Sequence, residues 1–117
     1  MTTDSRYYHN PRCSKSRGGL ALLHERGVQP QTVAYLDTPP SVDELRDILT
    51  MLAMPARDLL RTGEAEYKSL GLDDPTLTED ELLEAMHAHP ILIERPIFVH
   101  GDRAVIGRPI ENVLQLL

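Results

Sequence analysis

Hydrophobic and polar positions in the first third of the chain predict a strand, a helix and a second strand. Residues 5–8 form a short β-prone run, and residues 31–36 alternate apolar and polar positions as a second strand would. Between them, residues 14–26 predict a helix in which Leu20 and Leu23 share one face. A strand, a crossover helix and a second strand make a βαβ unit, so we expect these two strands to pair in parallel.

The middle of the chain, residues 41–89, predicts a block of short helices inserted between strands. Ser41 with Glu44, and Thr78 with Glu81, have the spacing of capping boxes, which mark the starts of two helices. Apolar residues at helical spacing follow each pair. Shorter helices are expected over residues 55–61 and 64–70.

The last part of the chain predicts a β-hairpin followed by a helix. Strands are expected over 96–100 and 103–106, because the Gly101-Asp102 pair between them is a two-residue hairpin signal. These two strands are therefore expected to be antiparallel. The final helix would open after Pro109, with an apolar face made of Ile110, Val113, Leu114 and Leu117.

Composition limits what such a chain can be. Its 117 residues can enclose one core, and a hydrophobic content of 41% with 26% charged residues is typical of globular proteins. A net charge of −6, a single Phe and no Trp argue against nucleic-acid binding. The apolar runs are too short to span a membrane, and no apolar signal region follows the polar start. One cysteine cannot form an internal disulfide, so we expect a protein of the reducing cytoplasm.

That cysteine, Cys13, stands in the most basic stretch of an acidic chain. Arg12, Lys15 and Arg17 surround it, and no acidic residue occurs over positions 5–24. It occupies the expected strand-to-helix junction, where unpaired backbone N–H groups and the helix dipole stabilise a thiolate, the reactive form of cysteine. A buried structural cysteine is the alternative, but polar and charged neighbours favour a nucleophile that meets an anionic substrate.

Residues 8–17, YHNPRCSKSR, resemble the active-site loop of the glutaredoxin-linked arsenate reductase family and its arsenate-reductase-like branch. The similarity continues in the family's order at residues 35–36, 38–40, 57–61, 89–96 and 107–109. The resemblance implies an α/β protein of thioredoxin-like fold, with a central four-stranded mixed sheet. In that fold residues 1–117 are a single domain, and residues 41–89 are a helical insertion between the βαβ unit and the C-terminal ββα unit.

Strand directions in this fold bring two arginines toward the thiol. The third strand runs antiparallel to the first, so Arg95 before it and Arg108 after the fourth strand should lie near Cys13. Arginine suits an oxyanion because its planar fork donates paired hydrogen bonds. The resemblance adds Arg61 as a third oxyanion ligand. His9 stands four residues before Cys13, where we expect it to lower the pKa of the thiol or to hold the loop. The resemblance also implies an active-site loop shaped by Asn10, Ser16, Arg17 and Pro96, the last at the position of a cis-proline.

Ser16 stands where dithiol relatives carry a second cysteine. A covalent adduct on Cys13 therefore needs an external thiol to clear it, and the resemblance implies glutathione followed by glutaredoxin.

We therefore expect a monomeric, cytoplasmic arsenate reductase that acts on arsenate or a similar small oxyanion. Glutathione would be a co-substrate and glutaredoxin a partner, with no bound cofactor. Five scattered histidines and one cysteine lack metal-ligand spacing, so no metal site is expected. Two alternatives remain open: a monothiol thiol-disulfide oxidoreductase of unknown substrate, and a non-enzymatic, Spx-like regulator that binds RNA polymerase.

Overall fold

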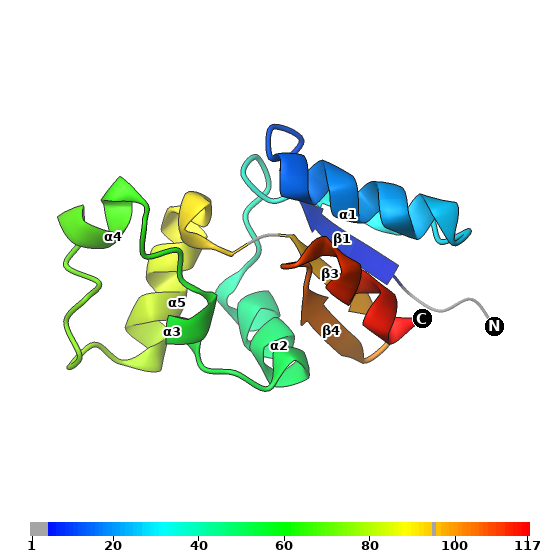
Figure 1. Cartoon of the computed structure of the whole chain (residues 1–117). Helices are drawn as coiled ribbons and strands as arrows, with labels where there is room; N and C mark the ends of the chain where they lie inside the picture. The colour runs from blue at the N-terminus through cyan, green and yellow to red at the C-terminus, as the bar shows by residue number, and fades with distance from the viewer. Residues whose placement is uncertain (1–4, 95) are drawn as a thin grey trace. The chain divides into compact units, whose positions relative to one another are not determined.

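A computed structural model of the chain describes residues 5–94 and 96–117 (Figure 1). The chain forms two compact units. The sheet unit comprises Met1–Thr38 and Arg95–Leu117, and the helical unit comprises Pro39–Glu94. The interpretation of residues 1–117 as a single domain stays a prediction.

The sheet unit is built on four strands in the order β2-β1-β3-β4. They are β1 (Ser5–His9), β2 (Gln31–Ala34), β3 (Ile97–His100) and β4 (Arg103–Ile106). β1 pairs in parallel with β2 and antiparallel with β3, and β4 pairs antiparallel with β3. The predicted mixed sheet and hairpin are therefore confirmed. β2 ends before the expected residue 36, because the Asp37 and Thr38 N–H groups both donate to the Ala34 carbonyl and turn the chain.

Two helices complete this unit, α1 (Ser14–Glu25) and the 3₁₀ helix η2 (Ile110–Leu116). They contact each other, and α1 also contacts β1 (Figure 1). The core between helices and sheet contains Tyr7, Leu23, Phe98, Val113 and Leu116. The last helix was expected as an ordinary helix, but it winds with the tighter 3₁₀ spacing that is typical of short terminal pieces.

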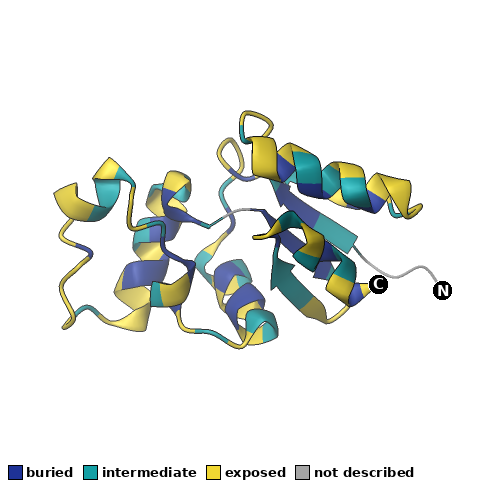
Figure 2. Cartoon of the chain, in the orientation of Figure 1, coloured by how far each residue is buried: buried dark blue, intermediate teal, exposed yellow. Residues whose placement is uncertain are grey.

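The helical unit confirms the predicted block of short helices. It contains α2 (Val42–Leu52), α3 (Ala56–Leu59), α4 (Ala65–Ser69), α5 (Glu79–Ala88) and the 3₁₀ turn η1 (Pro90–Leu92). Each long helix of this unit buries one apolar face (Figure 2), with Leu45, Ile48 and Leu49 on α2 and Leu82, Leu83 and Met86 on α5. None of the helices in the described part of the chain is long and apolar enough to cross a membrane.

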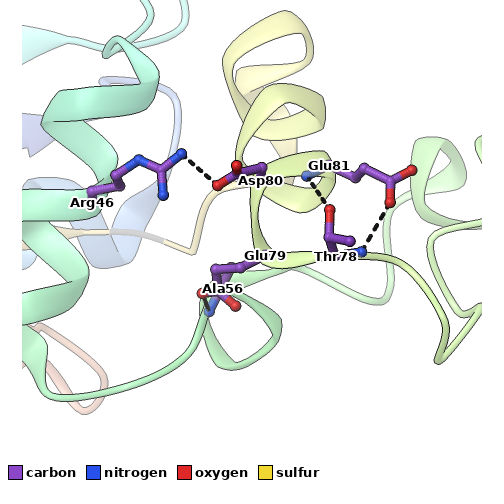
Figure 3. A network of polar contacts seen from close by, with 6 residues as sticks. All are labelled: Arg46, Ala56, Thr78, Glu79, Asp80 and Glu81. Carbon is purple, nitrogen blue, oxygen red and sulfur yellow. Dashed lines mark hydrogen bonds and ion pairs between the residues drawn. The ribbon is translucent and has the colours of Figure 1, made fainter.

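Both predicted helix starts are observed. Ser41 Oγ accepts the Glu44 N–H at 3.1 Å. Thr78 and Glu81 form a complete capping box, in which each side chain accepts the other residue's backbone N–H (Figure 3). Polar contacts then join three helices: the Ala56 N–H donates to Glu79 Oε1 at 2.6 Å, and Arg46 of α2 forms an ion pair with Asp80 of α5 (Figure 3).

Candidate functional site

Cys13 caps the N-terminus of α1, at the junction that the sequence pattern predicts. Its φ of −96° and ψ of 122° are extended, and its carbonyl accepts the first helical N–H, from Arg17, at 3.0 Å. Asn10 shapes the preceding loop: its carbonyl accepts the Cys13 N–H, and its Oδ1 accepts the Arg12 N–H, both at 3.0 Å. Arg17 adds a bond from Nη1 to the Pro11 carbonyl at 2.8 Å. The thiol, which is partly exposed, thus sits on a loop fixed by hydrogen bonds.

Arg108 reaches the thiol from the end of β4. Its Nη2 lies 3.9 Å from Cys13 Sγ, although the two residues are 95 positions apart in the chain. This placement follows from the strand directions, since the end of β4 returns to the edge of the sheet where β1 ends. The guanidinium thus donates toward the sulfur, and arginine is the side chain whose planar fork also suits an oxyanion.

The Ser16 side chain contacts two residues at the start of the loop. This side chain is fully buried, and its Oγ accepts the Asn10 N–H at 3.0 Å. The same oxygen lies 2.7 Å from His9 Nδ1, and we assign this contact to the Ser16 hydroxyl donating to a neutral ring. Burial, and then the positive charge of Arg17, lower the pKa of His9, which favours that neutral form. Ser16 therefore holds both His9 and the start of the loop.

Tyr7 and Gly19 also take part in the contacts around Ser16, and the sequence pattern did not identify either residue as part of the site. The fully buried Tyr7 hydroxyl donates to the Ser16 carbonyl at 2.6 Å, and burial raises its pKa. A Cβ on Gly19 would lie 2.5 Å from that hydroxyl oxygen, so only glycine leaves room for the tyrosine. The glycine inside a predicted helix was the available signal, but sequence alone gave it no partner.

The other predicted oxyanion ligands have different outcomes. In the helical unit, Arg61 Nη1 lies 2.7 Å from Glu64 Oε1, and its Nε lies 3.7 Å from Glu94 Oε1. Its role as an oxyanion ligand stays a prediction. Arg95, and with it the geometry of the Arg95–Pro96 bond, lies outside the described residues. Pro96 itself is buried beside Gly107, and a cis peptide bond joins Arg108 to Pro109.

A cavity of about 320 Å³ opens beside the loop, in the sheet unit. We call it the β2-side cavity. Its lining comes from the loop and from the turn after β2, namely His9, Asn10, Pro11, Arg12, Ala34, Leu36 and Asp37.

Acidification should weaken the fold through His9. The folded-state pKa of His9 is lowered from 6.5, so the unfolded chain takes up this proton more readily than the folded chain. Neutral His9 therefore adds to the free energy of unfolding above pH 6.5. This contribution declines as the pH falls from 6.5 toward the folded-state pKa of His9. Urea unfolding at about pH 7.5 and about pH 5.5 should therefore show a smaller pH effect for His9→Gln than for the parent. Equal pH effects would contradict this linkage.

Comparison with known proteins gives a family match along almost the whole chain. The profile of the ArsC family matches residues 8–116. An arsenate reductase of Neisseria meningitidis is 50% identical over 111 residues, covering 94% of this chain and 95% of that protein. YfgD of Escherichia coli K12, an uncharacterised protein, is 51% identical over 118 residues, covering 100% of this chain and 99% of that protein.

Comparison with solved structures indicates the same family. An arsenate reductase from Vibrio cholerae superposes with a TM-score of 0.96 at 47% identity, covering all of both chains. The four-stranded mixed sheet with its helices is therefore the thioredoxin-like fold of arsenate reductase structures.

Proposed function

Since the chain belongs to the ArsC family, we propose that it is a cytoplasmic arsenate reductase that uses Cys13 as its nucleophile and glutathione with glutaredoxin as its reductants. The observation that carries this proposal is the contact of Arg108 Nη2 with Cys13 Sγ at 3.9 Å, at the N-terminus of α1. A thiol, a guanidinium and a helix N-terminus at one point suit an attack on a small oxyanion.

The reaction would proceed in three steps. The Cys13 thiolate forms a bond to arsenic, and an arsenate oxygen leaves as water after protonation. A glutathione thiolate then forms a disulfide bond with the Cys13 sulfur. The sulfur–arsenic bond breaks, and its electron pair reduces arsenic to arsenite. Glutaredoxin finally reduces the mixed disulfide between Cys13 and glutathione by thiol–disulfide exchange.

The neighbouring residues would support these steps. Arg108 would hold the oxyanion, joined by Arg61 and Arg95 as the family resemblance implies. His9 and Ser16 would keep the loop in shape through the contact of 2.7 Å between them. No second thiol is needed, since glutathione supplies the one that the chain lacks.

A coupled assay tests the proposal. The parent protein, arsenate, glutathione, glutaredoxin and an NADPH-linked glutathione reductase should together give arsenate-dependent NADPH oxidation. Omitting glutaredoxin should stop NADPH oxidation, and omitting glutathione should stop the formation of arsenite, measured directly, because each supplies a separate thiol-exchange step. Full activity without either of them would contradict the proposed reductants.

A second function is favoured by one observation. The pairing of Arg61 with Glu64 and Glu94 engages one predicted oxyanion ligand within its own unit. A monothiol thiol-disulfide oxidoreductase would not need that ligand. NADPH oxidation that depends on a small disulfide substrate, glutathione and Cys13, without any response to arsenate, would identify this second function.

A further inference from the structure

The active-site loop has two chemically different sides. It follows β1, which lies between β2 and β3 in the sheet. On the β3–β4 side, Arg108 lies against the Cys13 sulfur. On the other side, where His9 pairs with Ala34 of β2, lies the β2-side cavity. The proposed reaction needs two reactants at one sulfur, and Arg108 marks the side of the oxyanion.

The β2-side cavity carries two opposite charges that do not pair with each other. Arg12 lines it from the loop and Asp37 lines it from the turn after β2. In the described part of the chain, neither the Arg12 guanidinium nor the Asp37 carboxylate has an ion pair or hydrogen bond. The turn that carries Asp37 is held by its backbone, whose N–H donates to the Ala34 carbonyl at 2.9 Å. Both charges are therefore available to a ligand.

The cavity also has the size and apolar surface for a small peptide-like molecule. Its volume of about 320 Å³ lies at the lower end of the range for small-molecule sites. Pro11, Ala34 and Leu36 contribute carbon surface between the charged groups. A fitting ligand is small, carries an ammonium and a carboxylate, and has methylene groups between them.

We propose that the β2-side cavity is the glutathione site of this protein. The assignment rests on the proposed function, which requires glutathione as second reactant. Asp37 binds the α-ammonium group of the γ-glutamyl residue, and Arg12 binds a carboxylate. Arg12 lines the cavity and directly precedes Cys13 in the chain, so glutathione held by Arg12 would lie next to the residue that carries the nucleophile. Oxyanion and glutathione then approach Cys13 from opposite sides.

Binding can be measured without any reaction by using S-methylglutathione, whose sulfur cannot attack. Isothermal titration calorimetry should show binding to the parent and about tenfold weaker binding to Asp37→Asn and to Arg12→Gln, because each loses one charged contact. Two matched variants at exposed charged positions of the same unit, Asp102→Asn and Arg26→Gln, should bind like the parent.

An analogue with an acetylated α-amine identifies the contact of Asp37. It lacks the ammonium group, so it should bind the parent and Asp37→Asn with equal, weakened affinity. The proposal is overturned if S-methylglutathione does not bind the parent, or if Asp37→Asn and Arg12→Gln bind it as the parent does.

Failure of this proposal and failure of the proposed function give different results. If the parent shows no arsenate turnover but binds S-methylglutathione in an Asp37-dependent way, arsenate is the wrong substrate and the cavity assignment stands. If arsenate turnover occurs and the KM for glutathione is the same in the parent and Asp37→Asn, the function stands and the cavity assignment fails.

Discussion

Replacing Cys13 with serine should abolish arsenate reduction, lowering the rate by at least about a thousandfold. A serine hydroxyl stays protonated at neutral pH, so the attacking anion is lost. Its oxygen also cannot form a disulfide with glutathione, so the later steps have no route. The two side chains are nearly the same size and position 13 is partly exposed, so the fold should persist.

Two measurements check this result. The coupled NADPH assay gives the rate, and intact mass spectrometry after mild oxidation with glutathione gives the adducts. The parent should carry one glutathione that glutaredoxin removes, because the chain has a single cysteine. Cys13→Ser should carry none and should match the parent in circular dichroism. Parent-like turnover in this variant would show that the chemistry does not pass through Cys13.

The second large effect concerns stability and involves the contact between Gly19 and Tyr7. Gly19→Ala places a Cβ 2.5 Å from the Tyr7 hydroxyl oxygen, and the ring is fully buried, so neighbouring atoms must shift. Such overpacking costs about 1–3 kcal/mol, which exceeds the gain in helix propensity of about 1 kcal/mol. Gly18→Ala is the matched control. Its Cβ would meet the flexible end of Ile110 at 3.1 Å, so the propensity gain should largely survive.

A double-mutant cycle isolates the cause. Tyr7→Phe removes the hydroxyl and its bond to the Ser16 carbonyl, at a cost of about 1 kcal/mol. In that background Gly19→Ala meets the ring carbon that bore the hydroxyl at 3.5 Å, an ordinary contact. The free energy of unfolding of the double variant should therefore exceed the value expected from the sum of the two single changes by at least about 1 kcal/mol. Urea unfolding measures all four proteins, and strict additivity would show that the hydroxyl is not the obstacle.

Local signals in the sequence accounted for most of the fold. The Gly101-Asp102 hairpin and the capping box of Thr78 with Glu81 are present, because each depends on residues a few positions apart. The approach of Arg108 to Cys13 was also predictable, since it needs strand directions but no side-chain detail.

Features that depend on side chains meeting across the fold could not be predicted. A glycine at position 19 is a weak helix former by local propensity, and its close contact with Tyr7 arises only when β1 and α1 pack together. Asp37 has no local signal of function, because the cavity that it lines forms between its turn and a loop distant in the sequence. Ser16 was interpreted only as a replacement for a second cysteine. Its burial could not be predicted from the pattern of hydrophobic and polar positions.

The burial of Ser16 also bears on how this protein can evolve. A serine codon can become a cysteine codon by one base change, so a single mutation would give this chain a dithiol motif. Sulfur accepts hydrogen bonds poorly, and a cysteine at position 16 would leave the Asn10 N–H without the acceptor that it has at 3.0 Å. The contact with His9 would weaken as well. In this chain, a second thiol at position 16 would therefore come at the expense of two contacts that hold the loop, so further substitutions around Asn10 and His9 would be needed to keep its shape.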